Sequence, residues 1–266
     1  MPELPDVEVF KRRFDETALH QTVGGLEVRD SGVLAYHGPG DLERRLQGRS
    51  FESSHRHGKR LFAGMSGGEW LELHFGMTGS LAYVADPDDA PPYTKVLLRL
   101  ENGRYLGFVD SRKLGHLALI ADLDARLKEQ GLGPDAYGLD PDAFLELAKK
   151  QRGQAKCWLM DQGKMAGIGN VYSDEILFQA GIHPKQPVKA LSDSALLNLH
   201  GSLRRVVDDA VDAAMHTKGI PADFLVPHRE PGGECPRCGA ALDTVKACGR
   251  TAYFCPKCQP GTFGGG

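Results

Sequence analysis

The sequence lacks any apolar run that approaches the ~18–20 residues of a membrane-spanning helix. It also lacks an N-terminal secretion signal, because charged residues begin at Glu3 and recur through Arg13. We therefore expect a cytoplasmic protein. In that compartment the six cysteines are more often metal ligands or free thiols than disulfides.

A strong excess of one charge is absent too, as are internal repeats and long low-complexity segments. The formal net charge of -3 over 266 residues argues against a strongly basic nucleic-acid binder, although a binding footprint can be local. Between residues 44 and 60 a single acid, Glu52, faces a run of basic side chains, namely Arg44, Arg45, Arg49, Arg56, Lys59 and Arg60. Such a run is equally typical of an ordinary solvated surface.

The pattern of apolar residues predicts one helix followed by many strands. Residues 6–19 place apolar side chains at helical spacing, and the pattern shortens after Gly24-Gly25. Strands are predicted at 26–30, 50–55, 60–65, 70–75, 80–84, 95–100, 104–109 and 114–120. Because Gly67-Gly68 and Asn102-Gly103 are hairpin signals, we expect a largely antiparallel β sandwich or barrel with one leading helix.

The period changes near residue 122, where helices become the predicted element. They are expected at 122–130, 141–151, 154–162, 170–180 and 192–216. The chain is thus predicted to be an α+β protein in four parts. These are an N-terminal helix with a β sandwich (1–121), a helical domain (122–217), a linker (218–234) and a metal-binding ribbon (235–266).

Four cysteines near the C-terminus have the spacing of a zinc ribbon. Cys235 and Cys238 form one C-x2-C pair, Cys255 and Cys258 form the second, and residues 239–254 lie between the pairs. Four thiolates with no open position indicate one structural zinc ion per chain. Cys157 and Cys248 lie outside this set, and the pattern assigns them no role.

The first residues carry a possible nucleophile. Removal of Met1 would expose Pro2 as a secondary amine, and an α-amino group has a pKa of about 7.7–8.0. Such an amine can form an iminium ion with a masked aldehyde, with Glu3 close enough to move protons. The alternative is that Pro2 and Pro5 only stiffen the arm that enters the first helix.

Two further features suit contacts with an anion. Gly167-Ile168-Gly169-Asn170 joins two predicted helices, and the backbone amides at the start of the second could bind a phosphate. Arg250 lies near the tip of the ribbon hairpin, where it could reach one as well. The alternatives are a simple N-cap for Asn170 and an ordinary exposed side chain for Arg250.

In this order the motifs resemble one family, the formamidopyrimidine-DNA glycosylases and endonuclease VIII enzymes of base-excision repair. The resemblance covers the full length of the chain. The matching segments are Pro2-Glu3-Leu4-Pro5, His55-x-x-Gly58-Lys59, His74 to Leu81, Asp110-Ser111-Arg112, Trp158 to Gln162, Gly167 to Tyr172, and Gly249 to Gln259.

The resemblance implies a bifunctional DNA glycosylase and abasic-site lyase that acts by β,δ-elimination. Pro2 would attack the sugar C1′ and Glu3 would relay protons, while Lys59 would hold phosphates beside the extruded nucleotide. Met77 and Arg112 would fill the space that the extruded base leaves.

The same resemblance implies a helix-two-turn-helix and a zinc ribbon that grip the DNA backbone through Asn170 and Arg250. The expected partner is damaged DNA. The protein is expected to be a monomer associated with the nucleoid, with no membrane partner.

Three departures from the family pattern leave the preferred lesion open. Asp6 stands where the family usually has Glu, and Leu114 takes the place of an aromatic wedge found in purine-specific members. The segment 218–234 is shorter than the loop that closes over oxidised guanine in those members. Two alternatives also stay open: a non-catalytic binder of damaged or abasic DNA, which retention of Met1 would favour, and a zinc-ribbon adaptor for a protein partner.

Overall fold

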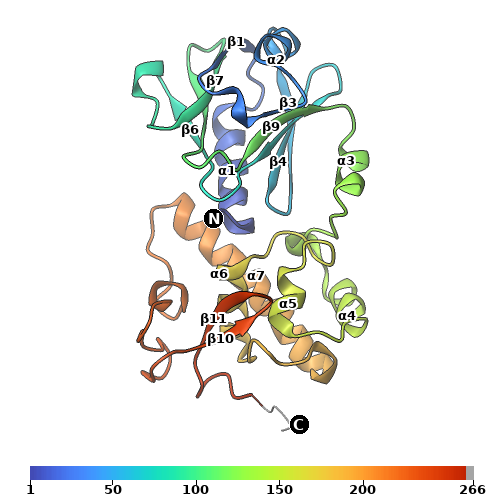
Figure 1. Cartoon of the computed structure of the whole chain (residues 1–266), viewed down its shortest axis with the longest axis vertical. Coiled ribbons are helices and arrows are strands. Elements are labelled where there is room, and N and C mark those ends of the chain that lie inside the picture. The colour runs from blue at the N-terminus through green and yellow to red at the C-terminus, as the bar shows by residue number, and fades with distance from the viewer. Residues whose placement is uncertain (262–266) are drawn as a thin grey trace. The chain divides into compact units, whose positions relative to one another are not determined.

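The computed structural model describes residues 1–261 and divides into two compact units, Met1–Gln130 and Gly131–Gly266 (Figure 1). The last residues of the predicted ribbon, 262–266, lie outside the described part. Within residues 1–261, no helix combines the length and the apolar character needed to cross a membrane.

The first unit begins with a helix and continues mainly as strands. Its helices are α1 (Leu4–Thr17), α2 (Pro39–Leu46) and α3 (Leu123–Glu129). Its strands are β1 (Val23–Val28), β2 (Leu34–Ala35), β3 (Phe51–His57), β4 (Arg60–Met65), β5 (Trp70–His74), β6 (Ser80–Val84), β7 (Thr94–Leu100), β8 (Tyr105–Val109) and β9 (His116–Ile120). Two short 3-10 turns, η1 (Ser31–Val33) and η2 (Pro87–Asp89), connect them.

The strands form two sheets. One has the order β1-β7-β8-β6 and the other the order β2-β9-β5-β4-β3. Neighbouring strands are antiparallel except β2 and β9, which are parallel. The predicted β sandwich with one leading helix is therefore confirmed.

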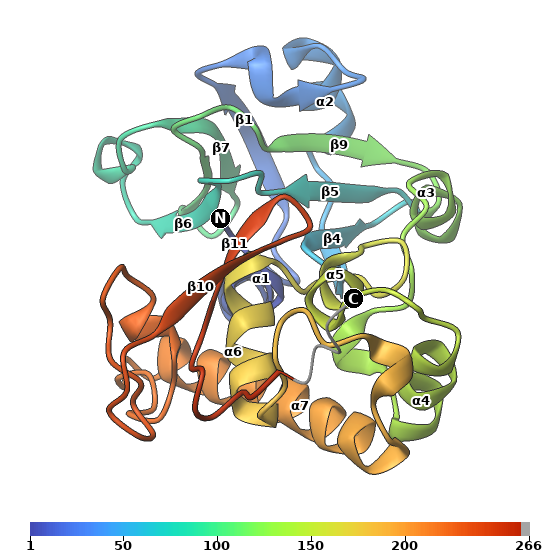
Figure 2. The ribbon, with the colours of Figure 1, turned by 60° about the horizontal axis from the view of Figure 1, so that its bottom comes forward.

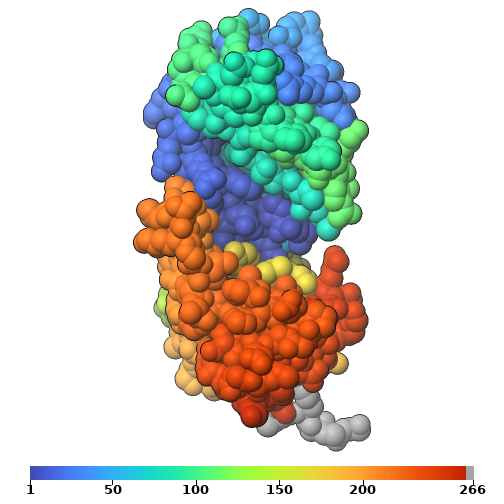
Figure 3. All heavy atoms as spheres, turned by 90° about the vertical axis from the view of Figure 1, so that its left-hand side faces the viewer, coloured from blue at the N-terminus to red at the C-terminus, as the bar shows by residue number. Residues whose placement is uncertain are grey.

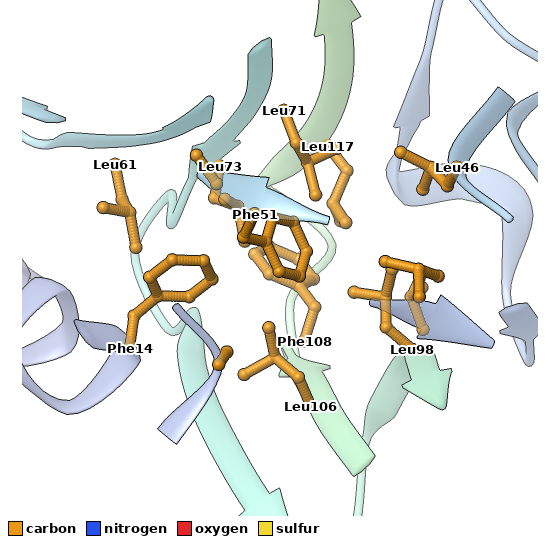
Figure 4. Close-up of a cluster of buried hydrophobic side chains, with 14 of the residues drawn as sticks. Phe14, Leu46, Phe51, Leu61, Leu71, Leu73, Leu98, Leu106, Phe108 and Leu117 are labelled. Carbon is orange, nitrogen blue, oxygen red and sulfur yellow. The ribbon is translucent and has the colours of Figure 1, made fainter. Parts of the chain in front are cut away.

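The core of this unit gathers side chains from both sheets and from α1 (Figure 4). Phe14 of α1 meets Phe51 of β3 edge to face, with ring centroids 5.1 Å apart. Leu98 and Phe108 reach the same cluster from the first sheet, and Leu71 reaches it from the second. Since burying such side chains stabilises each by about 1.5–3 kcal/mol, the packing fixes α1 and hence the arm that precedes it.

Helix α2 is an element that the sequence pattern missed. It is short and begins with Pro39 after Gly38, so its local signals indicate a turn. Leu42 and Leu46, one turn apart on the helix, are both buried in the core of the first unit. Burial of that apolar edge, rather than helix propensity, accounts for the helix.

Helix α3 belongs to the first unit, although the predicted boundary at residues 121 and 122 placed it in the second. Its Arg126 donates to the buried carboxylate of Glu72 at 2.8 Å, and Gln130 donates to the same group at 3.1 Å. Arg60 pairs with Glu72 at 3.0 Å. Burial opposes ionisation of Glu72, but donors from His116, Arg126 and Gln130 lower the pKa of this carboxyl to about 2.

The second unit is mostly helical. Its helices are α4 (Pro141–Lys149), α5 (Ala155–Met160), α6 (Asn170–Ala180) and α7 (Asp193–Met215). Of its three 3-10 turns, η3 (Ala136–Gly138) precedes α4, η4 (Val188–Ala190) lies between α6 and α7, and η5 (Val226–His228) follows α7. Ser192 caps α7 by accepting from the amide of Ala195, as its sequence predicts. The apolar side of α7, including Leu199, Leu203 and Val207, is buried.

A ribbon closes the described chain. Strands β10 (Asp243–Ala247) and β11 (Arg250–Phe254) pair in antiparallel fashion, and the hairpin runs beside α6 (Figure 2). Cys248 and Gly249 form its turn with φ of 51° and 70°. Positive φ at both central residues is the geometry that a two-residue hairpin favours. Figure 3 shows the linker and the ribbon as one continuous surface, in orange and red, on one face of this unit.

The expectation that the cysteines are metal ligands or free thiols rather than disulfides is wrong for two of the six, Cys157 and Cys248, to which the sequence pattern assigned no role. Cys157 of α5 and Cys248 of the hairpin turn are joined, with their Cα atoms 5.6 Å apart. The two residues are 91 positions apart in the sequence, so no spacing pattern could reveal the pair. Only the folding of the ribbon against the helices brings them together.

Candidate functional site

The N-terminal arm, residues 1–3, leads directly into α1. Glu3 precedes α1, and its backbone N–H donates to the carboxylate of Asp6 at 2.8 Å. The Glu3 side chain is almost fully buried and Pro2 is half-buried, whereas Met1 is 55% exposed. Asp6 thus serves as the acid that caps the helix from inside, a role that its shorter side chain fills as well as Glu would. The arm therefore presents Pro2 and Glu3 at a fixed place.

Lys59 lies within reach of the charges on this arm. It occupies the turn between β3 and β4, beside Gly58, whose φ is +58°. Burial lowers the pKa of Lys59, and the negative charges of Glu3 and Asp6 oppose that change. Burial raises the pKa of Asp6, against the charges of the amino terminus and Lys59. The charges of Glu3 and Asp6 on the arm thus act on Lys59, which is distant from them in the sequence.

A second cluster depends on one buried carboxylate, Asp110. It accepts from the Thr78 hydroxyl at 2.5 Å, from the Gly115 amide at 2.7 Å and from the Arg112 amide at 3.1 Å. Burial opposes its ionisation, but the hydrogen bonds from Thr78, Gly115 and Arg112 hold the pKa of Asp110 below its usual 3.8. Asp110 therefore ties the loop of residues 75–79 to the loop of residues 110–115.

These two loops touch along their backbones, which requires glycine. Gly76 has a φ of +56°, and a Cβ there would lie 2.4 Å from the carbonyl carbon of Leu114. A Cβ on Gly115 would lie 2.5 Å from the backbone oxygen of His74. The close contact makes the two loops one rigid support for three exposed predicted site residues, namely Met77, Arg112 and Leu114.

The basic run between residues 44 and 60 does not form an open cationic patch. Arg44 pairs with Asp41 at 3.2 Å, Arg49 with Glu69 at 2.6 Å, and Arg45 with Glu69 as well. Arg56 pairs with Glu8 at 2.9 Å, and Arg60 pairs with Glu72. Acids that lie elsewhere in the sequence neutralise the run, which a count along the chain could not show.

In the second unit Asn170 is the first residue of α6 and is not its cap. Gly169 takes the cap position with extended backbone angles, and no side chain caps this helix end. The Oδ1 atom of Asn170 is buried and has no hydrogen-bond partner within residues 1–261. The side-chain amide of Gln162 braces the preceding turn through bonds to Gly167 and Ile168. The N-cap alternative for Asn170 is therefore wrong, and a helix start is left with an unpaired acceptor.

The ribbon places four sulfur atoms around one point. The Sγ atoms of Cys235, Cys238, Cys255 and Cys258 all lie within 4.8 Å of one another. Two of the separations are 3.8 Å and 3.5 Å. A tetrahedral ion with zinc–sulfur bonds of about 2.3 Å needs sulfur atoms about 3.8 Å apart. The donor set and its spacing thus fit a structural zinc ion. Arg250 lies exposed at the start of β11.

Sequence reasoning missed the residues that support these groups. Asp110 belongs to the matching segment Asp110-Ser111-Arg112. The residues around it in the sequence do not show that its carboxylate binds two loops. Buried Lys156 is another such residue, because its ammonium donates to the backbone oxygen of Asn170 at 2.9 Å. A lysine inside an apolar helix segment is the signal that could have marked it, because lysine is almost never fully buried unless it is paired.

The first unit has a buried carboxylate on its N-terminal arm and exposed side chains on two joined loops, and the second unit has a helix start with an unpaired acceptor and an exposed arginine. Models of known protein families match three segments of the chain. Residues 1–117 match the formamidopyrimidine-DNA glycosylase N-terminal domain, residues 131–220 match the H2TH domain of the same enzymes, and residues 229–260 match a double zinc ribbon.

Individual proteins match over nearly their whole length. The chain is 35% identical to a formamidopyrimidine-DNA glycosylase of Moorella thermoacetica, over 92% of this chain and 95% of that protein. It is 33% identical to one of Synechocystis sp., over 98% and 99% of the two chains.

Among solved structures, the Lactococcus lactis enzyme in complex with DNA that contains N7-benzyl-Fapy-dG aligns with a TM-score of 0.86 and 25% identity, over 98% of this chain and 100% of that one. The same enzyme non-covalently bound to abasic-site DNA aligns with a TM-score of 0.84.

Proposed function

The chain belongs to the formamidopyrimidine-DNA glycosylase family, and from that premise we propose that it removes damaged bases from DNA and cleaves the abasic site that remains. The observation that carries this proposal is the N-terminal arm, in which the half-buried Pro2 is followed by the buried Glu3, whose charge acts on Lys59.

The reaction begins once Met1 has been removed and Pro2 carries a free amine. The amine nitrogen forms a bond to the sugar C1′, and the bond from C1′ to the damaged base breaks with its electrons leaving on the base. Glu3 supplies and takes up the protons that these steps require. The amine loses its proton, the C1′–O4′ bond of the sugar ring breaks, and O4′ takes up a proton from Glu3. The opened sugar then remains attached to Pro2 as an iminium ion, which allows loss of the 3′ phosphate and then of the 5′ phosphate.

Chemistry at C1′ requires the nucleotide to leave the base stack. We assign Met77, Arg112 and Leu114 to the space that it vacates, because an apolar side chain and a guanidinium can replace the lost stacking. The rigid junction of the two loops supports this role. If these three side chains were carried by flexible loops, the neighbouring stacked bases would displace them.

We assign contacts with the DNA backbone to Lys59, Asn170 and Arg250. Lys59 would hold phosphates next to the extruded nucleotide, while the start of α6 and the ribbon hairpin would bind others. Zinc held by the four ribbon cysteines supplies no chemistry and fixes the fold of the hairpin that carries Arg250. We further infer a monomer that acts at the nucleoid, since the family's substrate is DNA.

The test is reductive trapping on a duplex with one abasic site. Borohydride reduces an iminium ion to a stable amine, so protein and DNA should become one covalent species. Digestion should place the cross-link on the N-terminal peptide. Protein whose Met1 is retained, checked by intact mass, is the matched control and should not cross-link.

Lys59 is the rival amine, because burial lowers the pKa of its side chain and so favours its neutral form. A cross-link on the peptide that contains Lys59, or one that persists behind a blocked N-terminus, would refute the proline mechanism. Absence of any cross-link in protein with a free Pro2 would favour the non-catalytic binder.

A further inference from the structure

Two neighbouring residues of α5 connect to the two residues to which we assign backbone contacts in the second unit. Lys156 contacts the residue that starts α6, and Cys157 is bonded to the turn that precedes Arg250. Asn170 and Arg250 lie on separate elements, a helix and a ribbon. Helix α5 is therefore connected to both elements and can contribute to the spacing between them.

The Lys156 connection is fully buried. Its ammonium donates to the backbone oxygen of Asn170 at 2.9 Å, to the Ser173 hydroxyl at 2.8 Å and to the Asp174 carboxylate at 2.6 Å. Asp174 also accepts from the backbone N–H of Tyr253 at 3.1 Å and from Arg229. This network fixes the start of α6. It also holds β11 at Tyr253, near the end of the strand that is farther from the hairpin turn.

The Cys157 connection holds the other end of the hairpin. Cys248 lies in the turn, two residues before Arg250, and both turn residues have positive φ. Cys248 is exposed and Cys157 is partly exposed, so small reagents can reach the bond. Without this bond a turn of Cys248 and Gly249 would keep only its strand pairing, and the tip of a two-stranded hairpin is its most mobile part.

We propose that the Cys157–Cys248 disulfide positions Arg250 relative to Asn170, so that the protein grips two phosphates as one rigid unit only when the bond is formed. This inference rests on the proposed function, because it takes the backbone contact of Arg250 from there. The disulfide itself touches no DNA; it acts through Arg250. A preorganised contact costs less conformational entropy on binding, so loss of the bond lowers affinity.

The bond also makes the grip sensitive to reductants. A phosphine converts the disulfide to two thiols and becomes the phosphine oxide, with water supplying the oxygen and the protons. A two-electron oxidant such as hydrogen peroxide restores the bond and is reduced to water. The four ribbon cysteines are separate from this pair, so zinc content can be followed as an independent measure of ribbon integrity.

The experiment measures affinity for a duplex with one stable abasic analogue, at several salt concentrations. It compares the oxidised protein, the phosphine-reduced protein and the double variant Cys157→Ser, Cys248→Ser, each with and without Arg250→Ala. Alkylation and intact mass establish the thiol state, and metal analysis establishes that zinc is retained.

Loss of the disulfide should lower affinity by up to about tenfold, the order expected for one charge-assisted contact. It should also reduce the slope of log K against log salt by about 1, because one phosphate contact is lost. In the Arg250→Ala background the same loss should change neither quantity, since the residue that the bond positions is gone.

An equal fall in affinity in both backgrounds would show that the bond only stabilises the fold and would overturn the proposal. Equal affinity with and without the bond, or a pair of thiols that does not oxidise, would overturn it too. If Arg250→Ala alone has no effect in the oxidised protein, the positioning role fails. The glycosylase chemistry is judged separately by trapping at Pro2.

Discussion

Replacement of Asp110 by alanine tests whether one buried carboxylate supports the whole wedge. The change leaves donors from Thr78, Arg112 and Gly115 without their acceptor. Each buried donor that loses its partner costs about 1–3 kcal/mol. The Thr78 hydroxyl can rotate, and the Arg112 amide keeps a contact of 3.2 Å with it, so only Gly115 bears the full cost. With about 1 kcal/mol for the Thr78 bond, we expect the first unit to lose roughly 2–4 kcal/mol.

Urea unfolding of the full chain measures this loss. Asp110→Asn keeps the shape and one carbonyl oxygen, so it should fall between the wild type and the alanine variant. Thr78→Val removes a single donor and should cost about 1 kcal/mol. The carboxylate contributes its full stabilisation above its usual pKa near 3.8 and loses it as the pH falls through the lower value in the folded state. The difference between wild type and Asp110→Asn should therefore shrink only below about pH 4.

Excision by the folded variant gives the functional half of the test. Displacement of the wedge by about 1 Å can cost on the order of a hundredfold in rate. Excision of a stacked damaged base should fall by that order, while cleavage at a pre-formed abasic site should fall less because no base has to leave the stack. If Asp110→Ala unfolds at the same urea concentration as the wild type, Asp110 does not support Met77, Arg112 and Leu114. The same follows if excision and abasic-site cleavage fall by equal factors.

Four further outcomes follow from the same structure. Metal analysis should find one zinc ion per chain, and Cys238→Ser should release it and weaken DNA binding. Glu72→Gln should destabilise the first unit by about 3 kcal/mol at neutral pH, because the carboxyl has a pKa of about 2 in place of 4.5. That difference should close as acid protonates Glu72 between those two values, as followed by urea unfolding. Excision of oxidised guanine opposite cytosine should be weak, because Leu114 replaces an aromatic wedge and the 218–234 segment is short; robust excision would contradict this. In salt titrations Arg250→Ala should reduce the slope of log K by about 1, whereas Arg45→Ala should leave it unchanged.

Local patterns account for most of what the sequence predicted correctly. Helix α1 and the strands repeat apolar residues with periods that need no knowledge of the rest of the chain. The four ribbon cysteines and the glycine turns are also local. These signals were enough for the fold class.

Elements that depend on distant partners escaped prediction. Helix α2 exists because Leu42 and Leu46 reach a core built by other strands. The Cys157–Cys248 bond joins residues with no shared motif. Asp110 matched a motif, but its importance comes from the loop of Thr78, which lies far from it in the sequence. In each case the missing information was which segments meet, and that is decided by packing.

The effect of the charged residues also depends on which segments meet in the fold. An acidic chain that binds a polyanion cannot depend on a high density of positive charge. Five arginines of its densest basic run are each paired with an acid of the same unit, so we expect them to contribute little to DNA binding. Affinity must then come from few cations in fixed positions. In the function that we propose, rigid backbone contact around Arg112 and the disulfide before Arg250 would provide that fixed placement, because a contact held in its bound geometry loses little entropy on binding.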